Sequence, residues 1–113
     1  LMTVDPGKLD KMIEIIERTV TENENGYEAG HEDRVVRRCP AMFSRQSGTE
    51  ITKAQADFQR IKVRFLVRWT PAEINRRMIV RYDGREYGIE YVNDYGDGHR
   101  YIELWCGLLS LEG

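Results

Sequence analysis

Apolar and polar side chains alternate along several short segments of this chain. The clearest alternation covers residues 60–69, where apolar side chains share one face and mostly basic side chains share the other. Successive side chains of a strand point to opposite faces, so this pattern is typical of a strand. Residues 60–69 are therefore predicted to form a half-buried strand with a basic outer face.

Five further segments are predicted to be strands. Residues 11–21 alternate up to Ile15 and then shift phase, which predicts a strand with a bulge. A helix would also gather Met12, Ile15, Ile16 and Thr19 on one face, but the β-branched content favours a strand. The other segments, recognised by alternation or by β-branched and aromatic residues, are 34–44, 78–82, 86–92 and 100–106.

Turn signals separate these segments. Asn25-Gly26 lies in a polar loop expected from Glu22 to about Asp33, and Asp83-Gly84 between apolar runs predicts a tight hairpin. Residues 45–57 are the least strand-like and are expected to form one short helix or a long loop. About six strands joined largely by short hairpins predict a mainly β domain, a small antiparallel β-barrel with this irregular segment between its second and third strands.

The composition fits one small globular domain. With 113 residues, 41% hydrophobic and 32% charged, the chain is predicted to fold as a single domain over residues 1–113, with Leu1 interpreted as a tag remnant before Met2. No run approaches the roughly 18 apolar residues that cross a bilayer, and no basic-then-apolar leader opens the chain. A soluble, unexported protein is expected, with Cys39 and Cys106 as buried free thiols.

The net charge of −2 conceals an asymmetry along the chain. Residues 1–33 hold nine acidic and three basic side chains, whereas residues 60–85 hold eight basic and two acidic ones. Opposite poles on one small domain suit head-to-tail association between copies, although the two segments can equally neutralise each other within one fold.

The sequence shows no pattern of an enzyme or of a metal site. Neither histidine lies in a nucleophile motif, and the chain has no glycine-rich phosphate loop. Side chains that bind metals gather only in residues 31–33 and 94–99. The second group lacks the ligand spacing of a calcium loop, so a turn is the better interpretation. We therefore expect no catalysis, no metal and no cofactor.

Four motifs follow one another in a familiar order. They are Gly48-Thr49-Glu50 with Ala54, the strand 63–69 that closes on Arg68 and Trp69, the hairpin 78–89 with Tyr82-Asp83-Gly84-Arg85, and the strand 100–106. In this order and spacing they resemble the phage head-tail joining proteins, which include head-tail adaptor and head-closure proteins, and nearly the whole chain is covered. The strand 34–44 departs from that family, which often has tryptophan where this chain has Val36, Cys39, Ala41 and Phe43.

The resemblance implies a structural protein of the virion that works by assembly. Proteins of this family look like small β-barrels that form a ring below the portal, close the DNA-filled head and present a docking surface for the tail. The implied partners are the portal or connector ring protein, a tail-completion protein and further copies of this chain. Incidental contact with packaged double-stranded DNA is implied, and contact with a membrane is not. The isolated subunit is either monomeric or associated, and the implied location is the virion, with the host cytoplasm during assembly.

Two groups of residues are candidates for these contacts. The basic strand face would meet a neighbouring protein, DNA phosphates or solvent, and protein contact is favoured over DNA because DNA must slide through a channel. This group comprises Arg60, Lys62, Arg64, Arg68 and, on a nearby strand, Arg81. The segment 45–59 is the candidate for a loop that projects toward the channel, as the long loop of relatives does, through Gln46, Glu50, Lys53 and Gln55.

An OB-like module that binds single-stranded nucleic acid is the alternative from a different class of function. Aromatic side chains of the second half, among them Tyr82, Tyr87 and Trp105, resemble a stacking platform beside the arginines. Packing in the core is the plainer interpretation of the same rings. The chain also lacks the overall basic balance of a dedicated binder. A small hydrolase with an unrecognised site is a weaker alternative.

Overall fold

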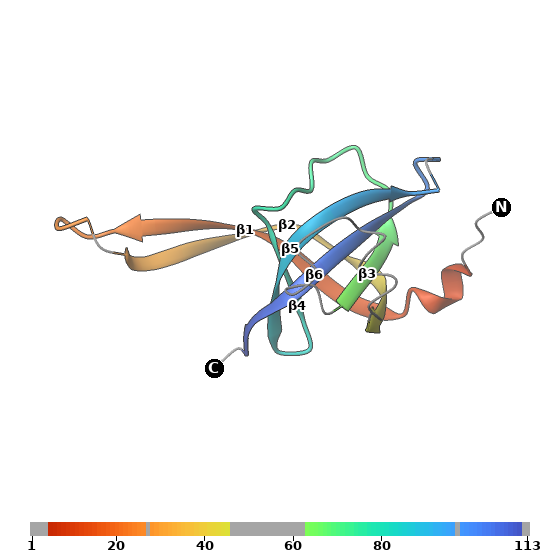
Figure 1. Cartoon of the computed structure of the whole chain (residues 1–113), viewed down its shortest axis with the longest axis horizontal. Coiled ribbons are helices and arrows are strands. Elements are labelled where there is room, and N and C mark those ends of the chain that lie inside the picture. Colours follow the sequence, from red (N-terminus) through yellow and green to blue (C-terminus); the bar gives the residue numbers. More distant parts are fainter. Residues whose placement is uncertain (1–4, 27, 46–62, 97, 112–113) are drawn as a thin grey trace.

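Six strands form one antiparallel sheet that closes on itself (Figure 1). The computed structural model describes residues 5–26, 28–45, 63–96 and 98–111. The strand order around the closed sheet is β1-β2-β3-β6-β5-β4, and the prediction of a mainly β fold of about six antiparallel strands is confirmed. The elements are a short 3-10 helix η1 (Pro6–Lys8) and the strands β1 (Lys11–Glu22), β2 (Glu28–Arg45), β3 (Val63–Arg68), β4 (Ile79–Tyr82), β5 (Arg85–Tyr95) and β6 (Tyr101–Leu111).

The closed sheet encloses the hydrophobic core. Val63, Phe65 and Val67 of β3 all point into it, as the alternation of residues 60–69 predicts. Cys39 and Cys106 lie in the same core and are free thiols, which confirms the expectation for both. Burial raises the pKa of both cysteines, so the thiolate form is disfavoured.

The pairing of β1 with β2 shifts register at Ile15 and Ile16, where the phase change in residues 11–21 predicts a bulge, and the helical alternative is wrong. Ile15 pairs with Arg37 and Ile16 pairs with Val35, so Val36 is an extra residue on β2 at this point. Ile15 and Ile16 are both buried although they are neighbours; Ile15 belongs to the core with Ile13, whereas Ile16 does not. Val36 packs against the core, whereas Val35 is left exposed.

The β1–β2 hairpin extends well beyond the closed sheet, and the loop expected from Glu22 to about Asp33 is wrong. β2 begins at Glu28, so only a short turn separates the two strands. The last pair between β1 and β4 is Ile16 with Ile79, and beyond it the hairpin pairs only with itself in the described residues. We call the part from Glu17 to Arg34 the arm. It projects along the long axis of a molecule that measures 54 × 27 × 25 Å (Figure 1).

The hairpin turns follow the sequence signals, but two strands are longer than expected. Asp83 and Gly84 have φ values of 53° and 73°, which fits a two-residue turn with both residues in the left-handed region. β5 continues to Tyr95 and β6 to Leu111, so the loop expected from residue 93 starts too early. Its first residues are paired with β6 across the hairpin.

The predicted helix or long loop at 45–57 falls almost wholly outside the described residues, as does the projecting loop at 45–59. Between β3 and β4 the described chain forms bends and turns without a helix. None of the helices in the described part of the chain is long and apolar enough to span a membrane.

Candidate functional site

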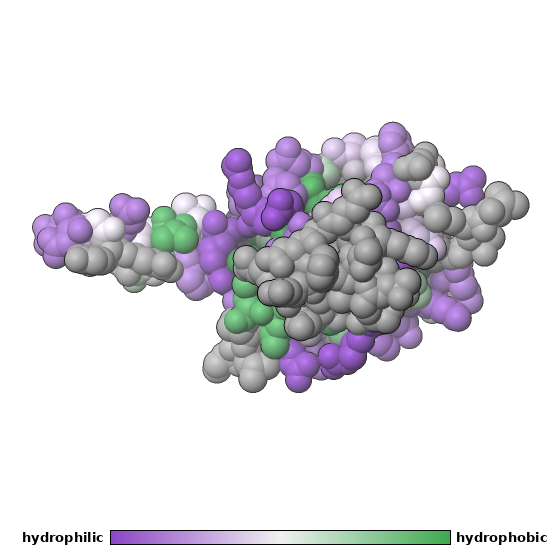
Figure 2. All heavy atoms as spheres, viewed as in Figure 1, coloured by the Kyte–Doolittle hydropathy of each residue, from purple (hydrophilic) through white to green (hydrophobic). Residues whose placement is uncertain are grey.

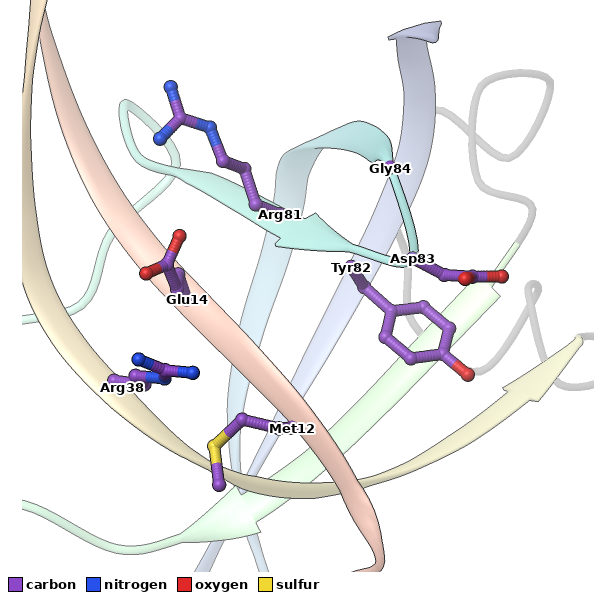
Figure 3. A pocket seen from close by; sticks show the side chains of 7 residues that line it. All are labelled: Met12, Glu14, Arg38, Arg81, Tyr82, Asp83 and Gly84. Carbon is purple, nitrogen blue, oxygen red and sulfur yellow. The ribbon is translucent and has the colours of Figure 1, made fainter. Parts of the chain in front are cut away.

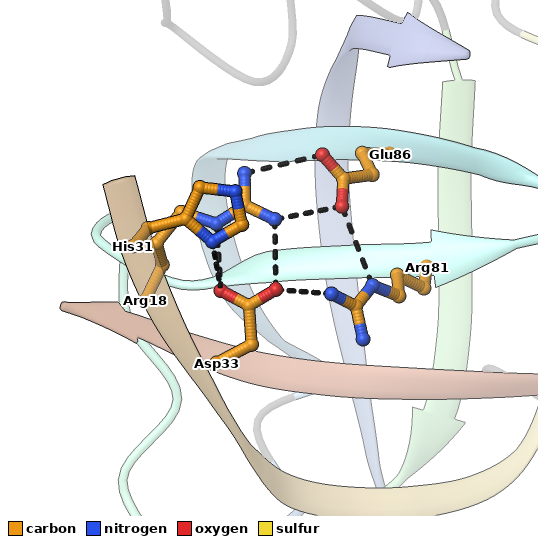
Figure 4. Close-up of polar contacts among 5 residues, drawn as sticks. All are labelled: Arg18, His31, Asp33, Arg81 and Glu86. Atoms are coloured by element: carbon orange, nitrogen blue, oxygen red, sulfur yellow. Dashed lines mark hydrogen bonds and ion pairs between the residues drawn. The ribbon is translucent and has the colours of Figure 1, made fainter. Parts of the chain in front are cut away.

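Four charged side chains from four strands meet where the arm leaves the closed sheet (Figure 4). Arg18 of β1 donates to both oxygens of Asp33 on β2, at 2.7 and 3.0 Å. It also donates to both oxygens of Glu86 on β5, at 3.1 and 2.7 Å. Arg81 of β4 completes the group by donating to Glu86 at 3.3 Å and to Asp33. We call these four residues the arm-base cluster.

The arm-base cluster is largely shielded from solvent. The side chains of Arg18, Asp33 and Glu86 are 18%, 13% and 10% exposed. Hydrogen bonds from Arg18 are the main cause that lowers the pKa of Asp33 to about 2, and they lower the pKa of Glu86 as well. Two arginines and two carboxylates alternate, so the cluster is neutral and ties the arm to β4 and β5.

The arm-base cluster should make stability depend on pH below about 4. Both carboxyl pKa values are lower in the folded state, so their contribution is present above the unfolded pKa of about 4 and is lost as pH falls toward 2. We expect the free energy of unfolding of Asp33→Asn to fall less than that of the wild type as pH decreases, by on the order of 1–2 kcal/mol. Urea unfolding between pH 6 and 2.5 measures it, with Asp10→Asn as a control at an exposed carboxyl. Parallel profiles for the wild type and Asp33→Asn would contradict the assignment.

A second polar group lies on the outer face of β3, β5 and β6. Glu103 accepts hydrogen bonds from Arg64 and from Asn93, each at 2.6 Å. The guanidinium of Arg64 also lies 5.7 Å from the ring centre of Tyr95 and 5.9 Å from that of Trp105. Glu103 is buried and Arg64 is mostly buried, so this group holds three strands together.

The candidate basic face is therefore not one uniform surface. Arg68 is exposed, whereas Arg64 and Arg81 are held by buried carboxylates in the two groups above. Residues outside the described part of the chain include Arg60, Lys62 and the channel-loop candidates Gln46, Glu50, Lys53 and Gln55.

Arg68 has basic neighbours that the sequence did not indicate. The side chain of Arg37 donates to the carbonyl oxygen of Arg68 at 2.8 Å, and the amide of Trp69 donates to the carbonyl oxygen of Arg100 at 2.9 Å. His99 stacks on Trp69 with ring centres 4.7 Å apart. We call Arg37, Arg68 and Arg100 the basic end, which lies beside the β5–β6 turn.

A shallow groove of about 340 Å³ lies on the outside of the closed sheet (Figure 3). Its walls come from β1, β2 and the β4–β5 turn, and its lining includes Met12, Glu14, Arg38 and Tyr82. Glu14 lies opposite Arg38 on one neighbouring strand and opposite Arg81 on the other. The lining mixes both signs of charge with no nucleophile and base pair, so it has the character of a contact surface.

The aromatic rings of the second half are mostly used in packing. The ring of Tyr82 lies 5.0 Å from that of Phe43 and 5.7 Å from that of Phe65, and Tyr87 and Trp105 are buried. Tyr87 and Trp105 are therefore not available to stack on bases, and Tyr82 packs against the core, which does not favour the OB-like alternative. Within the described ranges, no three side chains of His, Cys, Asp or Glu gather as a metal site.

Comparisons with known proteins decide between these classes of function. Residues 4–108 match the family of phage head completion proteins. The chain belongs to this family. Among solved structures, its fold is similar to a chain from the virion of a native gene transfer agent particle, with 14% identity, a TM-score of 0.56, and coverage of 88% of this chain and 94% of that chain. A search of the curated proteins gives no significant match.

Membership of the head completion family confirms the resemblance to head-closure proteins that the motif order indicates. The chain is a structural protein of the virion, in a family that is not one of enzymes. Its arm-base cluster was missed at the sequence level except for Arg81. One feature of the sequence does indicate the contact between Arg18 and Asp33: both residues are equally distant from the Asn25-Gly26 turn, as partners in a long hairpin are.

Proposed function

We propose that this chain is a head-closure subunit that assembles as a ring between the portal and the tail and helps to retain packaged DNA. The family match over residues 4–108 is the observation that carries the proposal. Its partners would be the portal or connector ring protein, a tail-completion protein and copies of itself. It would be made in the host cytoplasm and act in the virion.

The architecture supports a role in assembly. A small closed sheet with a projecting arm offers more contact surface than its own core requires. A ring of identical subunits needs a head-to-tail interface, in which each copy presents two different surfaces. The acidic arm and the basic end are two such surfaces.

Within this proposal, the candidate contact residues belong to two groups, the basic face and the channel loop. Arg68 is the described member of the basic face that is open to a neighbouring protein, whereas Arg64 and Arg81 act mainly within the fold. Arg60 and Lys62 remain candidates for the same contact. The segment with Gln46, Glu50, Lys53 and Gln55 is proposed to face the channel, where it would meet double-stranded DNA only in passing.

Particles made without this chain should package DNA but fail to keep it. We expect heads from cells that lack its gene to lose their DNA to added nuclease and to accept no tails, because the portal opening stays unsealed. Adding the purified full-length chain to such heads should restore both properties. The measurements are nuclease-protected DNA per head and the fraction of heads joined to tails.

A heat-denatured sample of the same chain serves as the control for this addition. Heads that keep their DNA and join tails without the chain would refute the proposal. Imaging of the restored particles at the portal vertex would show whether the chain occupies a ring.

A further inference from the structure

Beyond the arm-base cluster, the arm contributes little to the fold that carries it. Beyond Ile16 its two strands pair only with each other in the described residues, and no core lies behind them. A lone two-stranded hairpin is marginally stable in water, so an arm of this length is best explained by a surface that it contacts. Val20 on the arm is 50% exposed, which leaves an apolar spot among polar neighbours.

The arm is acidic toward its tip. From Arg18 to Asp33 the sequence has five carboxylates and one arginine. Glu22, Glu24 and Glu32 are exposed, and none of them forms an ion pair within the part of the chain that the structure describes. In Figure 2 the end of the arm is coloured as hydrophilic. Such a surface repels DNA phosphates and attracts a basic protein surface.

The basic end supplies a matching surface on the same chain. Arg68 and Arg100 are exposed, Arg37 reaches the carbonyl of Arg68, and Asp94 nearby is already paired with His99 at 3.2 Å. The β1–β2 turn and the β5–β6 turn lie at opposite ends of the long axis (Figure 1). One molecule therefore cannot bring its own arm to its own basic end, but a second copy can.

We propose that the acidic arm of one subunit binds the basic end of a second copy of this chain. The proposal rests on the ring assembly proposed above and names the surfaces that join neighbours in that ring. The arm-base cluster serves this contact by fixing the direction in which the arm leaves the sheet. Each copy gives an arm and receives one, which is the arrangement that a closed ring needs.

Cross-linking between engineered cysteines in assembled particles tests this contact. The full-length chain carrying Glu24→Cys and Arg100→Cys should give a ladder of disulfide-linked multimers under mild oxidation, because the two positions meet between neighbours. The native thiols are buried and do not compete. A chain carrying Glu24→Cys and Leu108→Cys is the matched control, since Leu108 is exposed and lies on β6 at the end away from the β5–β6 turn. It should cross-link at least about tenfold less.

Charge reversal gives a second and independent measurement. Glu22→Lys with Glu24→Lys should lower incorporation into particles about tenfold or more, and Arg68→Glu with Arg100→Glu should do the same, because like charges then face each other. Chains that carry all four changes should recover most of the loss. Absence of this recovery, or equal cross-linking in the control pair, overturns the proposed contact.

The result also separates this inference from the proposed function. If particles contain many copies of the chain at the portal vertex but show no arm-specific cross-link, the arm contact is wrong and the head-closure role stands. If particles never contain the chain, the head-closure role is wrong and the contact fails with it.

Discussion

Replacing Arg18 with methionine is expected to destabilise the protein by about 3–5 kcal/mol, because two largely buried carboxylates lose their main partner. Arg18 makes four hydrogen bonds of 2.7–3.1 Å, two to Asp33 and two to Glu86. Methionine keeps much of the apolar stem and removes the charge. A domain of this size is stable by only about 5–15 kcal/mol, so a large part of that stability is at stake.

Arg34→Met is the matched control, because Arg34 lies in the adjacent pair of the same hairpin. It bonds Glu17 at 3.0 Å, but these two side chains are 69% and 47% exposed. An exposed pair of this kind contributes about 0–1 kcal/mol. Urea unfolding at pH 7 compares the two variants. Equal losses would mean that burial does not strengthen the arm-base cluster.

The effect of Arg18→Met should reach the arm as well as the closed sheet. The cluster joins β1 and β2 of the arm to β4 and β5, so its loss frees the direction of the arm. Hydrogen exchange of backbone amides between Arg18 and Asp33 should therefore quicken more than exchange in β3. A variant that keeps its closed sheet but loses its arm direction would also assemble poorly.

Strands with one buried face could be predicted from the sequence, whereas strands without one could not. Residues 63–68 alternate because one face meets the core, and their strand is found where the alternation places it. Beyond the arm-base cluster the arm has solvent on both faces, so its second strand lacks alternation and its sequence predicts a loop up to Asp33. The end of β6 was missed for a similar reason, since Leu108 and Leu109 are both exposed.

The charged clusters show what a single sequence hides. Asp33 and Glu86 are 53 positions apart, and only closure of the sheet brings them to one arginine. The chain has 19 Asp and Glu residues, and the sequence alone does not distinguish Asp33 and Glu86, which become shielded, from the others. Arg64 and Arg68 lie on the face of β3 away from the core, as the alternation predicts, but the pairing of Arg64 with Glu103 required the register between β3 and β6. That register also places Leu66 beside Glu103.

Arg64→Glu should bring the folded state close to instability, because it would place a second carboxylate beside the buried Glu103. The wild-type side chains meet at 2.6 Å, with Glu103 also held by Asn93 at 2.6 Å. Removing the arginine alone is expected to cost about 3–5 kcal/mol, and the added like charge raises the loss further. The contacts of Arg64 with Tyr95 and Trp105 are lost as well.

Arg68→Glu is the control for this change, because Arg68 is exposed four residues further along the same strand, where a charge reversal should change stability by no more than about 0.5 kcal/mol. Urea titration at pH 7 gives the free energies of unfolding of the two variants. If Arg64→Glu is as stable as Arg68→Glu, Arg64 is a surface residue and returns to the candidates for partner contact.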